Sequence, residues 1–259
     1  MLDLRSAIAA VLLALSGIAT CRADDVPAIA AASDLKFALP VVVKAFESET
    51  GKTVKVTFGS SGVLATQIAN GAPFEVLFSA DEAIVKDLFV RGLLRDDGKI
   101  YGLGRLSVYA PVGSAVTCDA DLTGLKTALA AGKVGKFAIA NPEHAPYGRA
   151  ARDALQKAGL WDGVAPHLVL GENISQTLQF AIDGGADAAL VSAPLVEAPE
   201  FTGKGCHLRV SETLVAPLRQ SMGVSRTSSA TASAFAAFMI SAKGQEILAK
   251  YGFSFPPAP

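Results

Sequence analysis

The sequence has 259 residues, a formal net charge of −1 at pH 7, 51% hydrophobic residues and 18% charged residues. A chain of this length forms one large domain or two domains of roughly 100–150 residues. The balanced charge and the lack of any long basic run argue against a nucleic-acid partner. No internal stretch reaches the roughly 18–20 unbroken apolar residues that a membrane-spanning helix needs.

The N-terminus has the layout of a secretory signal peptide. An almost unbroken apolar run at 7–19 follows a basic residue, and small residues precede a cleavage position after Ala23. We therefore expect residues 1–23 to be removed and the protein to be periplasmic. Lipid attachment at Cys21 is the less favoured alternative, because Thr20 stands where such a signal has Gly or Ala.

Two cysteines remain once the signal peptide is removed, Cys118 and Cys206. In an exported protein an even pair can form a disulfide, and two isolated buried thiols are the alternative that the sequence leaves open. Neither cysteine lies in a CxxC motif, which argues against a redox or zinc-binding role.

The first part of the mature chain alternates strands and helices with short connections. A buried strand at Ala28–Ala32 leads to Ser33, a favoured N-cap residue, and then to apolar residues at helical spacing as far as Thr50. The next predicted elements are strands at 53–58 and 74–78 and helices at 63–70 and up to Val90. This alternation predicts a parallel sheet that is covered by helices on both faces.

A long β-type run at 100–110 is interpreted as a strand that passes from this lobe into a second one. The second lobe is predicted to contain strands at 137–140, 167–170, 188–191 and 206–210 and helices at 121–131, 149–158 and 174–182. A strand at 218–224 is interpreted as the return crossing, and helices at 228–240 and 243–250 pack back on the first lobe.

The predicted fold is therefore α/β and two-lobed, with a mixed, mostly parallel sheet in each lobe and two crossing strands between them. Lobe I is expected to comprise 24–104 and the return segment 218–259, and lobe II is expected to comprise 105–217.

Four predicted strand-to-helix turns share one chemistry. The first N–H groups of each helix lack partners within the helix, and the positive end of the helix dipole favours an anion. One such turn alone is better explained as a capped helix start. The four turns are Ala32-Ser33-Asp34, Ser60-Ser61-Gly62, Pro146-Tyr147-Gly148 and Glu172-Asn173-Ile174. If turns from both lobes face one cleft, they surround a small anion with uncharged donors.

Four runs of the sequence together resemble the molybdate-binding (ModA) family: AASDLKFAL, FGSSGVLATQIANGAPFEVLFSADE, NPEHAPYGRAARDAL and QEILAKYGF. Members of that family are exported solute-binding proteins of ATP-driven importers and have the two-lobed periplasmic binding protein fold (type II). The resemblance implies capture of a tetrahedral oxyanion, molybdate or tungstate, and its delivery to the membrane permease of an ABC importer. It also implies no enzymatic activity, no cofactor and no protein ligand to a metal, and we expect a monomer.

Carried over position by position, the resemblance places the ligand-binding residues at Ser33, Ser61, Tyr147, Ile174 and Ser192. Ser33 and Ser61 would donate through their hydroxyl groups, and Tyr147 and Ile174 would donate through backbone N–H groups. The supporting residues are Asp34, Ser60 and Gly62. We expect Asp34 to supply only its N–H and to point its carboxylate outward, because a carboxylate that faced the anion would repel it.

The sequence departs from the family at two positions. Ser192 stands where several members have a tyrosine whose hydroxyl reaches the anion, so either Ser192 donates over a shorter reach or the Tyr147 phenol replaces that group. Val63 stands where many relatives have Asn. These departures leave open a different oxyanion or a small carboxylate. Phosphate is expected to be disfavoured, because a site made only of donors gives its proton no acceptor.

Other functional classes are weaker alternatives. The Gly59-Ser60-Ser61-Gly62 turn is not the GxSxG elbow of a hydrolase, and Asp81-Glu82 is better explained as a turn and helix start than as a catalytic pair. The histidines are scattered without metal-ligand spacing and are interpreted as structural or surface residues: His144, His167 and His207. A ligand-reporting module for a membrane sensor stays as a further alternative.

Overall fold

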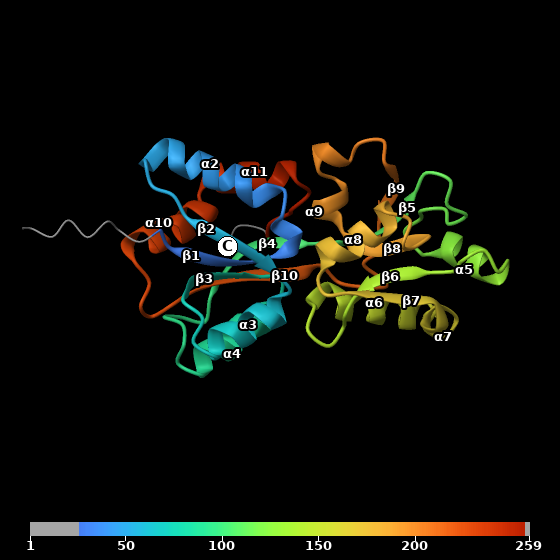
Figure 1. Cartoon of the computed structure of the whole chain (residues 1–259), viewed down its shortest axis with the longest axis horizontal. Helices are drawn as coiled ribbons and strands as arrows, with labels where there is room; N and C mark the ends of the chain where they lie inside the picture. The colour runs from blue at the N-terminus through green and yellow to red at the C-terminus, as the bar shows by residue number, and fades with distance from the viewer. Residues whose placement is uncertain (1–25, 257–259) are drawn as a thin grey trace, which may run out of the picture.

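Strands and helices alternate along residues 26–256, which are the residues that the computed structural model describes. The predicted signal peptide at 1–23, with the alternative lipid attachment at Cys21, lies outside this range. The described chain forms two lobes side by side (Figure 1), each built on a five-stranded sheet. No helix within 26–256 combines the length and the apolar character that a membrane crossing requires.

Lobe I is built on the sheet β2-β1-β3-β10-β4. Its strands are β1 (Ala28–Ala32), β2 (Lys55–Gly59), β3 (Phe74–Ser79), β4 (Lys99–Gly104) and β10 (Leu218–Val224). Its helical elements are the 3-10 turn η1 (Ser33–Leu35), α2 (Ala38–Thr50), α3 (Ser61–Ala69), α4 (Glu82–Val90), α10 (Ala230–Met239) and α11 (Ala242–Lys250). Strand β1 pairs in parallel with β2 and β3, and β10 runs antiparallel to β3 and β4.

Strand β1, which lies between β2 and β3, is buried on both faces. Ile29 and Ala31 pack into the cluster formed with α2, α10 and α11, whereas Ala30 packs into the cluster formed with α3 and α4. Figure 1 shows α2 and α11 on one side of the sheet and α3 and α4 on the other. A strand whose alternate residues both face helices needs an unbroken apolar sequence, as this strand has.

Lobe II is built on the sheet β7-β6-β8-β5-β9. Its strands are β5 (Leu106–Pro111), β6 (Phe137–Ala140), β7 (Leu168–Gly171), β8 (Ala188–Ser192) and β9 (Gly205–Arg209). Its helical elements are α5 (Thr123–Ala130), α6 (Pro146–Lys157), α7 (Trp161–Val164), η2 (Ala165–His167), α8 (Ile174–Ile182), α9 (Ala193–Val196) and η3 (Pro199–Phe201). Strand β6 is parallel to β7 and β8, and β5 is antiparallel to β8 and β9.

Two connections join the lobes. The first is Arg105, which separates β4 in the sheet of lobe I from β5 in the sheet of lobe II. The second is the segment 210–217, which leads from β9 to β10. Because β10 lies wholly between β3 and β4, the interpretation of 218–224 as a crossing strand is wrong, although the strand itself is confirmed.

Two helix starts near the lobe boundary differ from the predictions. Helix α6 begins at Pro146 and not at 149, because a proline at the first helical position loses no hydrogen bond. Ser33 is not an N-cap: it begins the 3-10 turn η1, makes no side-chain cap bond, and is followed by α2 only from Ala38. As a result, two predicted ligand residues, Ser33 and Tyr147, lie in the first turn of a helical element.

Smaller differences follow from local capping. Helix α3 begins at Ser61, two residues earlier than predicted. Helix α10 begins at Ala230 and not at 228, and it is capped by Ser229, whose side chain accepts from the N–H of Ala232. The short helices α7 and α9 were not predicted, because four residues are too few to show helical periodicity.

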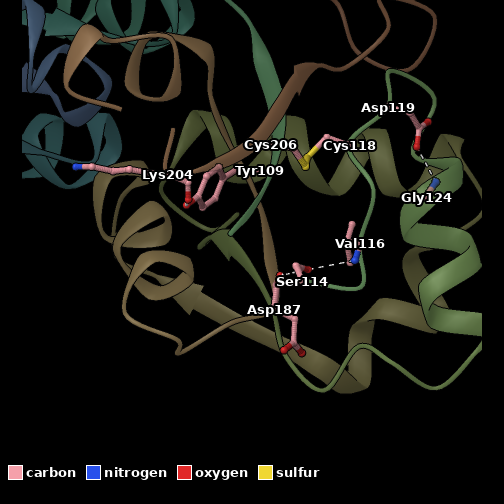
Figure 2. Close-up of a disulfide and its surroundings, with 9 residues drawn as sticks. All are labelled: Tyr109, Ser114, Val116, Cys118, Asp119, Gly124, Asp187, Lys204 and Cys206. Carbon is pink, nitrogen blue, oxygen red and sulfur yellow. Dashed lines mark hydrogen bonds between the residues drawn. A yellow bond between two sulfur atoms is a disulfide. The ribbon is translucent and has the colours of Figure 1, made fainter. Parts of the chain in front are cut away.

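A disulfide joins Cys118 and Cys206, with their Cα atoms 5.9 Å apart (Figure 2). Cys206 lies on β9, an edge strand of the lobe II sheet, and Cys118 lies in the loop between β5 and α5. The Tyr109 hydroxyl beside the bond donates to the carbonyl oxygen of Lys204 at 2.8 Å. The bond therefore joins a long loop to an edge strand that pairs with only one neighbour, β5. Of the two possibilities that the sequence left open, the structure shows the disulfide and not two isolated thiols.

Replacing both cysteines with serine, Cys118→Ser with Cys206→Ser, is expected to lower the free energy of unfolding by roughly 3–5 kcal/mol. The reason is the sequence separation of 88 residues that the bond closes. Urea unfolding followed by circular dichroism measures the loss. Reductant should lower the stability of the wild type by a similar amount and leave the double variant unchanged. A wild type that is indifferent to reductant contradicts the prediction.

Candidate functional site

A small cavity lies where the turns of the two lobes meet. Its volume is about 10 Å³, which is room for about one water-sized group, so the lobes have to part slightly to admit anything larger. The residues that line it are Ala32, Ser33, Asp34, Gly59, Ser60, Ser61, Ala80, Ala145, Pro146, Tyr147 and Ile174. They follow β1, β2 and β3 in lobe I and begin α6 and α8 in lobe II.

The structure therefore brings all four predicted turns to one place. The carboxyl ends of parallel strands in both sheets meet at this cavity, as expected for open α/β sheets. Among the described residues that line it there is no lysine, arginine or histidine. Any anion bound here is held by hydroxyl and backbone donors and by the positive ends of helices.

Ser33 and Ser61 present hydroxyl groups whose protons are free for a ligand. The Ser33 oxygen accepts from the N–H of Ser175 at 3.3 Å, and the Ser61 oxygen accepts from the N–H of Ala80 at 3.0 Å. Both serines are at most 3% exposed. Because each oxygen accepts from a backbone group, its own O–H remains available to donate.

Tyr147 and Ile174 present backbone N–H groups. Each lies in the first turn of its helix, where no carbonyl oxygen of the same helix can accept from it. The N-cap side chain of Asn173 accepts from Ser175 and Gln176, at 3.1 Å each, and does not use the N–H of Ile174. Two helix starts of lobe II thus face the two serines of lobe I.

The Ser60 hydroxyl and the Gly62 N–H hold the lobes together, so these two groups are not free to donate to a ligand. The Ser60 hydroxyl donates to the carbonyl oxygen of His144 at 2.6 Å, and the Gly62 N–H donates to the same oxygen at 3.0 Å. A Cβ on Gly62 would collide with that oxygen. Both contacts are with the other lobe, so a supporting role at the ligand stays a prediction.

The expectation that the Asp34 carboxylate points outward is wrong. The residue is 1% exposed, and its Oδ2 accepts from the Tyr147 hydroxyl at 3.0 Å and from Gln220 Nε2 at 2.6 Å. These two donors replace part of the hydration that burial removes, which is why the carboxyl can lie inside. The expectation of a site lined by donors alone is therefore also wrong, because Asp34 is an acceptor on the cavity wall.

Burial raises the pKa of Asp34 from its usual 3.8 to about 6, and the hydrogen bonds from Gln220 and Tyr147 limit the rise. Burial and the charge of Asp34 raise the pKa of Tyr147 and of Tyr101 well above the usual range, so both phenols stay protonated. The Tyr101 hydroxyl donates to Gln220 Oε1 at 2.5 Å. Sequence reasoning missed Tyr101 and Gln220, because both lie in strands without a motif.

The structure places the two candidates for the missing family tyrosine differently. Ser192 is fully buried at the end of β8, is not among the residues that line the cavity, and has a hydroxyl without a hydrogen-bond partner in the described chain. The Tyr147 phenol is held by Asp34 and Gln220. Of these two residues, only Tyr147 is among those that line the cavity.

A larger groove of about 640 Å³ adjoins the cavity and shares Ala80 and Pro146 with it. An ion pair crosses this groove between Arg149 of lobe II and Asp81 of lobe I at 2.7 Å. Asp81 also caps α4 by accepting from Ala83 at 2.9 Å, which confirms the interpretation as a helix start. No cluster of three or more His, Cys, Asp or Glu side chains suited to a metal ion occurs within 26–256.

Comparisons with known proteins agree with this geometry. The family described as bacterial extracellular solute-binding protein matches residues 28–254. The molybdate-binding protein ModA of Rhodobacter capsulatus is 35% identical over 211 residues, which are 80% of this chain and 80% of that protein. The putative ABC transporter substrate-binding lipoprotein YvgL of Bacillus subtilis (strain 168) is 31% identical over 167 residues, 63% of this chain and 61% of that protein. The solved periplasmic molybdate-binding protein of Azotobacter vinelandii has a TM-score of 0.81 at 26% identity, covering 89% of this chain and 99% of its own.

Asp34→Asn is expected to raise the free energy of unfolding at pH 8 by roughly 3 kcal/mol and to change it little at pH 4. Folding raises the pKa of Asp34 to about 6, so the folded state binds the proton more tightly than the unfolded state. Wild-type stability therefore falls as pH rises from about 4 through 6 and then levels off. Asparagine keeps a side-chain oxygen for Gln220 and Tyr147 but carries no charge.

Urea unfolding of the ligand-free protein at the two pH values measures this difference. Asp96→Asn is the matched control, because Asp96 accepts from the N–H of Gly98 in an exposed turn. A change of equal size at pH 4 and pH 8 contradicts the assignment of the raised pKa to Asp34.

Proposed function

The chain belongs to the molybdate-binding (ModA) family of bacterial extracellular solute-binding proteins, and we propose that it captures molybdate or tungstate between its lobes for an ABC importer. This membership confirms the resemblance found in the sequence and makes the chain a solute-binding protein, not an enzyme. The observation that carries the proposal is the interlobe cavity, where uncharged donors from both lobes converge on a space that a slight parting of the lobes would enlarge.

We assign the ligand contacts to two groups from each lobe. The hydroxyls of Ser33 and Ser61 donate from lobe I, and the backbone N–H groups of Tyr147 and Ile174 donate from lobe II. A tetrahedral oxyanion presents oxygens in four directions, so donors on opposite walls can all be used at once. Because these helix starts carry partial positive charge, a dianion is stabilised without a lysine or arginine.

Closure of the lobes is part of the proposed mechanism. The four donors face one cavity only while lobe I and lobe II are in contact, so a bound anion favours the closed arrangement over an open one. Interlobe bonds at His144 and at the Arg149–Asp81 pair support the closed form. The two connections at Arg105 and 210–217 are the places where a hinge motion would occur.

A different ligand on the same fold is the second candidate function. Ser192, which stands where several family members have a tyrosine, is not among the residues that line the cavity, whereas the acidic residue Asp34 is. Both observations favour testing other oxyanions and small carboxylates beside molybdate and tungstate.

We further propose that the protein works in the periplasm as a monomer and meets a membrane permease there. The signal-peptide layout at 1–23 and the extracellular family support export. One relative is named a lipoprotein, so attachment through Cys21 is the alternative that mass spectrometry of the exported protein would reveal.

Calorimetry with molybdate, tungstate, sulfate, phosphate and chromate tests the proposed function. We expect molybdate and tungstate to bind with micromolar or tighter affinity, which is a binding free energy of about −8 kcal/mol or more negative. Sulfate is expected to bind more weakly. Ser33→Ala and Ser61→Ala should each weaken molybdate binding by roughly 1–3 kcal/mol, because each removes a hydrogen bond to a charged ligand.

Ser48→Ala is the matched control, because Ser48 is exposed on α2, outside the cavity lining. Unchanged affinity in Ser61→Ala would show that the site is wrongly assigned. If none of the five anions gives a heat of binding, the proposed function is wrong.

Gly62→Ala tests the role of lobe closure. The added Cβ would meet the His144 carbonyl oxygen across the lobes, so we expect molybdate affinity to fall by roughly 1–3 kcal/mol while the fold is kept. Small-angle scattering should show less compaction on adding molybdate than in the wild type. Gly163→Ala is the control, because its Cβ would find only Leu129 at 3.9 Å. Wild-type affinity and compaction in Gly62→Ala would argue against closure as described.

A further inference from the structure

Asp34 is the only acidic residue among the described residues that line the interlobe cavity. Its Oδ2 accepts both side-chain hydrogen bonds, from Tyr147 and from Gln220. Its Oδ1 is buried and has no hydrogen-bond partner in the described chain. A buried carboxyl oxygen without a partner is costly and unusual, so it calls for a group that the protein itself does not supply.

No positive charge within residues 26–256 explains the burial of this carboxyl. The elements that pack against η1 include α8 and α9, which have no ionisable side chain, and β2, whose single charged residue Lys55 begins the strand at its far end. The titratable side chains on the neighbouring elements are those of Tyr101, Tyr147 and the exposed Lys36. Two arginines also lie there, but each is paired with an acid: Arg149 with Asp81 and Arg219 with Glu82. The backbone N–H groups of Asp34 and Leu35 lower the pKa of the carboxyl, but neither makes a hydrogen bond to Oδ1.

A dianion in the same cavity would meet this carboxyl at close range. Two like charges that share a dry site disfavour each other's ionised form, and a proton held between them removes the repulsion. The same proton would give Oδ1 its missing hydrogen bond.

We propose that the Asp34 carboxyl shares one proton with an oxygen of the bound oxyanion, through Oδ1. This inference rests on the proposed function and adds the protonation state in which the ligand is held. With molybdate, one proton is taken up from solvent, Oδ1 carries it, and the O–H donates to a molybdate oxygen. With a ligand that carries its own proton, such as hydrogen phosphate, that proton donates to Oδ1 and none is taken up.

The ionisation of the empty site makes this uptake measurable. Burial places the pKa of Asp34 at about 6, so at pH 7 to 8 the free carboxyl is mostly ionised. Molybdate binding at these pH values should therefore take up close to one proton per ligand. It follows that the dissociation constant should rise about tenfold for each unit of pH in this range.

Calorimetry of the wild type with sodium molybdate at pH 7.5, in two buffers of very different ionisation heat, counts the protons. The difference between the two observed heats should correspond to about one proton. Titrations at pH 7 and pH 8 should show the tenfold change in affinity. These wild-type measurements decide the question even if a variant fails to fold.

Asp34→Asn identifies the residue responsible. The amide keeps an oxygen for Tyr147 and Gln220 and places an N–H where the shared proton would lie. We expect its molybdate binding to give the same heat in both buffers and the same affinity at pH 7 and pH 8. His144→Gln is the control for a titratable side chain at the lobe contact, whose ring nitrogen lies 3.1 Å from the Ser60 hydroxyl. Glutamine at this position keeps the backbone oxygen that accepts from Ser60 and Gly62. This variant should retain the proton uptake.

The outcomes separate this inference from the proposed function. Molybdate binding with equal heats in both buffers in the wild type overturns the inference and leaves the function in place. Proton uptake that persists in Asp34→Asn, or that disappears in His144→Gln, also overturns it, because the proton then lies elsewhere. No binding of any tetrahedral anion overturns the function itself.

Discussion

Unpaired N–H groups at the starts of helices are the constraint on which this structure depends. Such groups can be satisfied only by an acceptor that lies beyond the N-terminus of the helix, and a parallel sheet puts the starts of its helices at one edge. Two sheets facing each other at these edges leave a space ringed by donors. The 3-10 turn after β1, the start of α3 and the starts of α6 and α8 all open on the cavity. The position of the site is thus determined by the chain topology, and the side chains add to donors that the backbone already provides.

Close contact between the lobes sets a second requirement, which is small residues at their boundary. Gly62 leaves room for the His144 carbonyl oxygen, and Gly104, the last residue of β4, leaves room for the Tyr147 hydroxyl and the Gln220 amide. A side chain at either position would force the lobes apart or displace the buried network. The Asp34–Tyr147 bond can therefore join residues 113 positions apart only because Gly104 beside it carries no Cβ.

The sequence alone predicted the parts of this structure that depend on local patterns. The strand at Phe137–Ala140 and the helix at Ile174–Ile182 were placed at their observed bounds, and the four turns were recognised from their small and polar residues. The direction of the Asp34 side chain was predicted wrongly, because it depends on Gln220, 186 positions away. The position of Ser192 was missed for a related reason. Whether a short side chain reaches a cavity depends on the backbone of the other elements, which no motif encodes.

The order of strands in lobe I has a consequence for how the chain reaches its final form. Strand β10 lies between β3 and β4, yet it follows the whole of lobe II in the chain. Lobe II is continuous from β5 to β9 and can assemble from its own residues, whereas the sheet of lobe I stays split until the last part of the chain arrives. Pairing across so long a separation is slow, because the loop has to close before the contacts form. The sheet of lobe I can therefore be completed only after the whole of lobe II has been added to the chain.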